Sequence, residues 1–246
     1  MPGRRNSAGL KQEEGSRRQE RAERILDAAS ELIQRWGYNK TTIDDIAKQA
    51  GVAKGTIYLH WKTREDLFRA LMNREEMLMA EDIRQRMASD PEGMTLHGMM
   101  KNAMLVTMKR PLMKAVVLRD TDMMGEWARN EYSTEAYQKR LEGYKTFIEF
   151  LRSQGAVRTD SSFRDMMYLL SILSIGMLVV DQWLPEELQL SDEEAVELLA
   201  KTVQRMLEPP TAPPEDAARE VSNVFKQYMD FVVNSTKEQS QKEMEL

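Results

Sequence analysis

The amino-acid sequence predicts an all-α protein with a small N-terminal head, a larger helical body and an added C-terminal helix. Apolar residues recur at spacings of three and four along most of the 246 residues, and the period-two alternation of a half-buried strand is absent. Gly and Pro punctuate the chain between these periodic segments, as expected at helix ends. Hydrophobic residues make up 41% of the chain, which is enough to build a core around such helices.

The head and the body carry opposite net charge. Residues 1–75 hold 15 Lys and Arg against 11 Asp and Glu, a net of +4. The remaining residues hold 20 against 29, a net of −9. A cationic head on an acidic body places any phosphate-facing surface at the N-terminal end.

The chain begins with a polar segment, residues 1–17, which we predict to be a disordered basic arm. Two uses are open for it, either an arm that enters a DNA minor groove or a plain solvated tail. The first helix is predicted from about Arg18 to Trp36, where Gly37 ends it. Its buried stripe comprises Ile25, Leu26, Ala29, Leu32, Ile33 and Trp36.

Residues Thr41 to Trp61 have the pattern of a helix-turn-helix. Thr42 offers a hydroxyl at a helix start, and Asp45 follows three residues later, as in a capping box. Gly51 stands where a positive φ turns the chain sharply. The apolar residues that anchor the two helices are Ile43, Ile46, Ala47, Ala50, Val52, Ile57 and Trp61. The predicted DNA-binding domain spans residues 18–62.

The remaining face of the second helix carries hydrogen-bond donors, a small residue and flat rings. Lys54 suits a guanine edge or a phosphate, and Leu59 suits a thymine methyl group. Gly55 lets a backbone approach DNA closely, while Tyr58 and His60 suit phosphate or sugar. The alternatives are that Tyr58 packs within the head and that His60 caps a helix end. The predicted DNA-contacting residues are Thr42, Lys54, Gly55, Thr56, Tyr58, Leu59, His60 and Lys62.

Residues 63–208 are predicted to form a helical body. Thr63 caps a long helix that runs towards Met87 and so links the head to the body. Pro91 and Gly93 break the chain after this helix. Further helices are predicted at Thr95–Arg110, after Pro111, at Asn130–Gln154, at Phe163–Leu184 and, behind a Ser191 cap, at Asp192–Leu207.

Residues 209–246 are predicted to be a Pro-rich linker followed by an amphipathic helix. Four prolines stiffen the break at Pro209, Pro210, Pro213 and Pro214. Apolar residues then recur at helical spacing at Val221, Val224, Phe225, Tyr228, Met229 and Val232. A helix with such a face is not stable alone, so it packs either on its own body or on a partner subunit.

The helix-turn-helix region resembles the TetR (tetracycline-repressor) family of bacterial transcription regulators. The matching positions are Thr41-Thr42, Ile46-Ala47, Ala50-Gly51-Val52, Gly55-Thr56-Ile57-Tyr58, His60-Trp61-Lys62 and Glu65-Asp66-Leu67-Phe68. The resemblance covers roughly Arg18 to Leu71, and the Gly-Thr-Ile-Tyr-x-His-Trp run makes it specific. One departure is Ala53, where the family often has a Ser that caps the recognition helix. The free N–H groups of that helix then turn to water or to phosphate.

The resemblance implies a homodimer. A single recognition helix is too small for useful specificity, and a symmetric pair reads half-sites about 34–36 Å or more apart in a palindromic operator. The last two body helices are then expected to form a four-helix bundle with those of the partner. The predicted dimerisation residues are Met166, Leu170, Leu173, Met177, Val180, Leu199, Val203 and Met206. The alternative is that these stripes are internal core.

The resemblance also implies a body that binds a small effector, whose binding releases a repressor from DNA. The body is rich in Met, whose unbranched and polarisable side chain suits a pocket for apolar ligands. The alternative is that Met simply fills a helical core. The predicted ligand-binding residues are Met100, Met104, Met108, Met123, Trp127, Tyr144 and Met177. The charge of the effector and the choice between repressor and activator stay open.

Other classes of function have little support in the sequence. His60 and His97 are the only histidines and Cys is absent, so we expect no enzyme, no cofactor and no metal site. The N-terminus lacks an apolar signal segment, and the most apolar run, Leu169–Val180, is short for a bilayer. A cytoplasmic protein is therefore expected. The rival interpretation is a helical protein-interaction adaptor without DNA binding.

Overall fold

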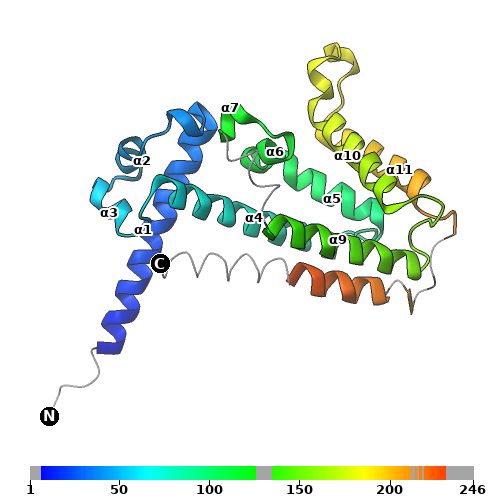
Figure 1. Cartoon of the computed structure of the whole chain (residues 1–246), viewed down its shortest axis with the longest axis horizontal. Helices are drawn as coiled ribbons and strands as arrows, with labels where there is room; N and C mark the ends of the chain where they lie inside the picture. Colours follow the sequence, from blue (N-terminus) through cyan, green and yellow to red (C-terminus); the bar gives the residue numbers. More distant parts are fainter. Residues whose placement is uncertain (1–6, 126–134, 212–213, 215, 218, 231–246) are drawn as a thin grey trace.

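The protein is a bundle of α-helices divided into a head and a body (Figure 1). The structure is a computed structural model, and it describes residues 7–125, 135–211, 214, 216–217 and 219–230. Throughout these ranges every regular element is helical, which confirms the predicted all-α class.

The head is built from three helices and a short 3₁₀ turn. These elements are α1 (Ser7–Trp36), η1 (Tyr38–Lys40), α2 (Ile43–Ala50) and α3 (Lys54–Tyr58). Their apolar stripes meet in one core, where Ile25, Ile33, Ile46 and Ile57 are at most 2% exposed. The head therefore has the three-helix arrangement that the sequence predicted.

Helix α1 is longer than the sequence analysis predicted. It begins at Ser7 instead of near Arg18, so most of the segment predicted as a disordered arm is helical. The segment has no Pro after Pro2 and is rich in Lys, Gln, Glu and Arg, all of which favour the helix. Its N-terminal half projects away from the rest of the molecule (Figure 1).

Helix α4 (Arg64–Ser89) connects the head to the body without a break. It begins with a capping box between Thr63 and Asp66, as predicted. Its first half buries Phe68 and Leu71 in the head core, and its second half buries Met87 in the body core. The long connecting helix of the prediction is confirmed.

The body contains the remaining helices. They are α5 (Leu96–Met108), α6 (Pro111–Leu118), α7 (Thr121–Met124), α9 (Glu135–Ser153), α10 (Phe163–Val179), η3 (Val180–Gln182), η4 (Glu186–Leu188) and α11 (Asp192–Leu207). Helix α11 packs most extensively on α5. The Ser191 cap and its partner Glu194 form the capping box that begins α11. Among the described residues the predicted order of body helices is confirmed.

The head and the body also meet at a second place, away from α4. Leu112 and Met113 of α6 and Met124 of α7 belong to the head core. Gly37 has φ 80° and ψ 159° and lies directly against the carbonyl oxygen of Asp122 at the start of α7. A side chain at Gly37 would collide with that backbone, so this junction requires glycine.

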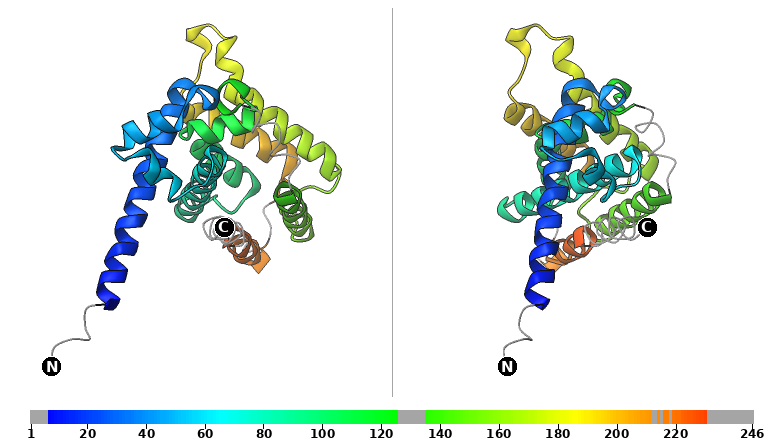
Figure 2. Two further views of the ribbon diagram at one scale, coloured as in Figure 1. Left: turned by 60° about the vertical axis from the view of Figure 1, so that its left-hand side comes forward. Right: turned by 90° about the vertical axis from the view of Figure 1, so that its left-hand side faces the viewer.

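The end of α10 and the segment that follows it project from the body as an arm (Figure 2). Trp183 and Leu188 on this arm are 72% and 60% exposed. The segment Phe163–Gln182 is long and apolar enough to cross a membrane by length and composition alone, and 17% of it is buried. It is therefore longer than the apolar run identified in the sequence, and most of its surface lies outside the core.

The added C-terminal helix, residues 216–217 and 219–230, packs on its own body beside α9 (Figures 1 and 2). Val221, Phe225 and Met229 of this helix are 2%, 6% and 6% exposed and belong to the body core. Of the two alternatives left open by the sequence, the structure therefore shows packing on the chain's own body.

Candidate DNA-binding site

The helix-turn-helix is formed by α2, a glycine turn and α3. The Thr42 hydroxyl accepts a hydrogen bond from the Asp45 backbone N–H, and the Asp45 carboxylate accepts one from the Thr42 backbone N–H. Gly51 ends α2 in the left-handed region, with φ 65° and ψ 38°. Ile57, at 0% exposure, fixes α3 to the head core. Thr42 thus sets where α2 begins, and its exposed position leaves it beside the outer surface of the motif.

The outer face of α3 forms a ridge that nothing else in the described chain covers. Tyr58 and Leu59 are 46% and 76% exposed, and Lys54 is exposed beside them. A Cβ added at Gly55 would meet no atom within 4 Å. Nothing in the described part of the chain therefore requires glycine there, and the backbone of α3 is open to close approach from outside. The alternative that Tyr58 packs within the head does not fit its exposure.

Lys54 is paired within the free protein. Its Nζ lies 2.8 Å from the Oδ2 of Asp44 on α2, and both side chains are at least 50% exposed. The hydrogen bond to Asp44 raises the pKa of Lys54. The sequence analysis did not identify this partner, because Asp44 belongs to the preceding helix. A DNA group that recruits Lys54 must therefore compete with Asp44.

His60 and Trp61 close the motif after α3. Trp61 is 7% exposed and packs in the head core, and the two rings lie 5.3 Å apart between centroids. Burial, together with the charges of Arg18 and Arg21 on α1, lowers the pKa of His60. His60 is therefore half-buried and mostly neutral at neutral pH, so it offers a hydrogen bond instead of a cation.

Arg18 and Arg21 are cations that the sequence analysis did not assign to the site. Arg18 donates a hydrogen bond to the backbone oxygen of Leu59 over 3.4 Å, and both arginines act on His60. They lie on the same face of α1, three residues apart. Their helical spacing was the available signal, but only the fold shows that this face meets the end of α3. Lys62 is a further exposed cation, just before the Thr63 cap.

The start of α3 lacks a side-chain cap, as the sequence predicted. Ala53 is the N-cap residue and makes no side-chain hydrogen bond. Thr56, which follows within the first turn, is half-buried. Its backbone N–H donates to the Ala53 carbonyl oxygen over 2.8 Å, so the first turn of α3 is held by backbone and lacks only a side-chain cap.

The predicted ligand-binding residues lie in different parts of the structure. Met100, Met104, Met108, Tyr144 and Met177 all belong to the body core or pack against it. Burial raises the pKa of Tyr144 to about 12. Met108 and Met177 also line an apolar groove of about 410 Å³ between α10 and α11.

Two of the predicted ligand-binding residues do not join this group. Met123 packs against the head core, which corrects its assignment to a pocket in the body. Its short helix α7 turns towards the head, a direction that periodicity alone does not give. Trp127 lies outside the described residues.

The predicted dimerisation residues also divide into groups. Four are buried in the chain's own core, so their assignment to a contact between subunits is corrected: Met166, Leu170, Leu199 and Val203, each at most 5% exposed. Leu173 and Met177 are half-buried along the α10–α11 groove. Val180 and Met206 are 39% and 49% exposed.

An outer apolar face lies on another side of α10. It consists of Tyr168, Ile172 and Ile175, which are 72%, 53% and 44% exposed. Leu198 of α11 is 57% exposed and lines the α10–α11 groove. The sequence analysis did not name this exposed stripe, because α10 is apolar on nearly every side. Periodicity therefore could not separate the buried stripe from the exposed one.

Comparison with known proteins adds to this geometry. Residues 25–71 match the family model described as bacterial regulatory proteins, tetR family. The fatty acid metabolism regulator protein of Bacillus subtilis is 47% identical over 66 residues, which are 25% of this chain and 34% of that protein. The HTH-type transcriptional regulator QacR of Staphylococcus aureus is 44% identical over 54 residues, which are 22% of this chain and 29% of that protein. The chain thus matches these curated relatives over about a third of their length.

A solved structure extends the likeness to the body. The transcriptional regulator FadR from Bacillus subtilis, in complex with stearoyl-CoA, matches 73% of this chain and 96% of its own chain, with a TM-score of 0.53. The two sequences are 20% identical, so this match concerns the fold alone. Residues 25–71 therefore match the head of the tetR family of bacterial regulatory proteins, and the larger part of the chain shares its fold with a solved regulator of transcription.

Proposed function

We propose that this protein is a dimeric, sequence-specific DNA-binding regulator of transcription. In this proposal it is a repressor that a small apolar ligand releases from a palindromic operator. The head, residues 18–62, reads DNA, residues 63–208 bind ligand and partner, and residues 209–246 form the linker and added helix. The observation that carries the proposal is the uncovered ridge of α3, where Tyr58 and Leu59 stay exposed beside an open Gly55.

The chemistry of the ridge suits a duplex. An apolar side chain as exposed as Leu59 is unfavourable in water but fits a thymine methyl group in the major groove. Lys54 and Lys62 supply donors to base edges or phosphates, and Arg18 and Arg21 lie next to the ridge. The net charge of +4 over residues 1–75 favours approach of this end to DNA.

The outer apolar face supports the homodimer. Three large apolar side chains lie exposed on one side of α10, and Leu198 of α11 is exposed along the adjacent groove. A soluble monomer seldom leaves so much apolar surface open. A second copy of the chain covers such a patch through a twofold axis and places two recognition ridges on one side of a duplex. We therefore assign the patch to a partner subunit and not to lipid.

The body supports an apolar effector. Its core contains flexible methionines beside Tyr144 and Phe147, which adapt to varied apolar shapes. The Bacillus subtilis regulator of similar fold was solved with stearoyl-CoA, which carries a long apolar chain. An amphipathic molecule of this kind is the effector class that we propose.

The DNA-binding part is tested by selecting duplexes from a random pool and measuring affinity by gel shift. Tyr58→Ala should weaken binding to the selected duplex about 5–150-fold, as expected for a contact worth about 1–3 kcal/mol. Leu78→Ala, which truncates an exposed apolar residue of α4, is the control and should bind like the wild type. Failure of the wild type to bind any duplex at low salt would point instead to a protein-interaction adaptor.

The dimer is tested by light scattering and analytical ultracentrifugation. Ile172→Asp places a charge in the outer apolar face and should convert dimers to monomers. Leu78→Asp adds the same charge at an exposed apolar site on α4 and should leave the dimer intact. A wild-type chain that sediments as a monomer at high concentration would contradict the proposed assembly.

A further inference from the structure

The C-terminal helix, residues 216–217 and 219–230, covers an apolar surface of the body and is called the lid below. Val221, Phe225 and Met229 recur every four residues and form its buried stripe. The opposite side of the lid carries exposed polar residues, among them Lys226 and Gln227. The lid therefore presents an apolar edge to the body and a polar edge to water, as an amphipathic ligand does.

Beneath the lid lies a surface formed mainly by α9. The Phe147 ring lies 5.7 Å from that of Phe225 and stacks on Tyr228 at 5.8 Å with an interplanar angle of 10°. A Cβ at Gly143 would lie 3.2 Å from the Tyr228 ring, so the lid approaches the α9 backbone closely. Phe147 is only 5% exposed while the lid is in place.

Helix α4 forms the other side of this surface. Met87 belongs to the same core cluster as Phe225 and Met229. Asp230 contributes, after the stronger effect of Glu81, to raising the pKa of Arg84 on α4. Figure 2 shows the lid between α9 and the α4–α5 pair. Removing the lid would thus uncover an apolar groove whose one wall runs directly into the DNA-binding head.

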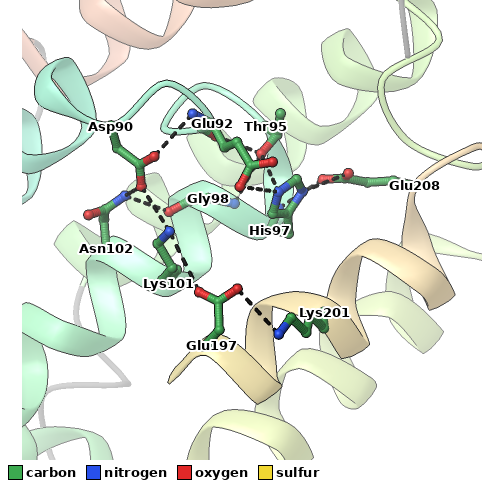
Figure 3. Close-up of polar contacts among 10 residues, drawn as sticks. All are labelled: Asp90, Glu92, Thr95, His97, Gly98, Lys101, Asn102, Glu197, Lys201 and Glu208. Atoms are coloured by element: carbon green, nitrogen blue, oxygen red, sulfur yellow. Dashed lines mark hydrogen bonds and ion pairs between the residues drawn. The ribbon is translucent and has the colours of Figure 1, made fainter. Parts of the chain in front are cut away.

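The lid is tethered at a fixed point. Glu208, at the end of α11, accepts hydrogen bonds from the backbone N–H of His97 and from its ring Nδ1, each over 2.8 Å (Figure 3). The His97 Nε2 lies 3.5 Å from a carboxylate oxygen of Glu92. The Pro-rich linker begins immediately after this contact between Glu208 and His97, so the lid can leave the groove without disturbing α11.

The lid depends on the body for its stability. Away from the body the apolar stripe of its described residues would be exposed to water, and most of the stability of such an amphipathic helix comes from packing of that stripe. A short linker nevertheless keeps it at a high effective concentration near the groove. A lid under these conditions can act as an intramolecular competitor: it fills the groove in the free protein, and a ligand that binds the groove displaces the whole helix.

We propose that the lid occupies the site of an amphipathic small molecule with an apolar chain, and that ligand and lid exclude one another. The site is the groove of Tyr144, Phe147 and Leu151 on α9, with Met87 on α4. This proposal rests on the ligand-responsive function proposed above. It adds that the binding surface is hidden in the free protein, and that opening it removes a support from α4.

The first test measures lid position in the full chain. Because the chain has no Cys, Lys145→Cys on α9 and Lys226→Cys on the lid give a unique pair of spin-label sites, both exposed. The free protein should give one narrow distance distribution. Saturating stearoyl-CoA, or parinaric acid as a fluorescent chain without the nucleotide, should broaden it and move it to longer distance. Bound probe with an unchanged distribution overturns the proposal.

The second test forces the lid open. Phe225→Glu places a charge in the buried stripe, whereas Lys226→Glu changes the adjacent exposed residue and serves as the matched control. A lid that is open in 1–10% of free molecules reduces apparent affinity by that fraction, so Phe225→Glu should bind parinaric acid about 10–100-fold more tightly. The control should bind like the wild type.

Equal affinity of Phe225→Glu and wild type, or no binding of the probe to either, overturns the proposal. The spin-label measurement on the unaltered lid covers the case in which Phe225→Glu does not fold. Both readouts are made without DNA. If the protein did not bind DNA, the proposed regulator function would be wrong, but the spin-label and affinity measurements would still decide whether ligand displaces the lid.

Discussion

Replacing Gly37 with Ala should damage the junction between the head and the body. Gly37 has φ 80° and ψ 159°, in a region that is accessible essentially to glycine alone. A Cβ there would also lie less than 3.0 Å from the carbonyl oxygen of Asp122, which belongs to backbone and has no rotamer to relieve the collision. Either the 3₁₀ turn η1 or helix α7 must move away.

The magnitude follows from these two costs. Holding a non-glycine residue in that backbone region costs about 1–3 kcal/mol. Forcing an extra carbon into a packed contact costs about 1–3 kcal/mol more. Gly51→Ala is the matched control, because Gly51 also has positive φ but would meet no atom within 4 Å. It should lose only about 1–2 kcal/mol, the cost of the left-handed conformation.

Thermal unfolding followed by circular dichroism measures both variants. At about 3 °C per kcal/mol for a chain of this size, mid-range values give a loss in Tm of about 12 °C for Gly37→Ala and about 5 °C for Gly51→Ala. Urea unfolding provides the free energies independently. Equal losses for the two variants would refute the reasoning, because they would show that the contact with Asp122 adds nothing to the backbone strain.

Three further predictions concern single side chains. Thr42→Ala removes the cap of α2 and should lower the free energy of unfolding by about 0.5–2 kcal/mol in urea, whereas Thr42→Ser should restore it. Lys62→Ala should weaken all duplexes alike and reduce the salt slope of binding by about one, unlike Lys145→Ala on the body. The hydrogen bond to Glu208 raises the pKa of His97, so this pair stabilises the fold fully below about pH 6.5, and that stabilisation is lost as pH rises through the raised folded value. Glu208→Gln should flatten the fall in unfolding free energy between pH 6 and 8; an unchanged pH profile would exclude this pair as its source.

The local features of the head could be read from the sequence because they depend on neighbours in the chain. Thr42 with Asp45, Thr63 with Asp66 and the left-handed Gly51 are all determined within a few residues. A Thr three residues before an Asp, just ahead of an apolar periodic segment, is typical of the capping box that begins a helix. The exposure of Leu59 was likewise predictable, because Ile57 and Trp61 already define the buried side of α3.

Features that depend on packing between distant helices could not be predicted in this way. Asp44 reaches Lys54 only because of the angle between α2 and α3, and Arg18 meets Leu59 across 41 positions of sequence. The choice between Met166 and Ile172 as the outward residue of α10 depended on which side α11 covers. When a helix is apolar on nearly all sides, the spacing of its apolar residues does not show which side is buried.

The way in which α4 and α6 are shared suggests where a switching motion takes place. Helix α4 buries Leu71 in the head core and Met87 in the body core, and α6 places Leu112 in the first cluster and packs Leu118 against the second. Two helices embedded in both cores, together with the Gly37 contact, resist a hinge between head and body because both cores would have to repack.

A ligand-driven change is therefore expected to rotate whole subunits at the outer apolar face, not to bend each chain. Spin labels at Lys48→Cys should report a change in head-to-head distance when ligand binds the dimer. A second pair, Lys48→Cys with Lys145→Cys in dimers diluted with unlabelled chain, should keep its distance within one subunit. If the distance between labels changed only within one subunit, the hinge would lie inside the chain. That result would show that α4 and α6 do not restrain a bending motion between head and body.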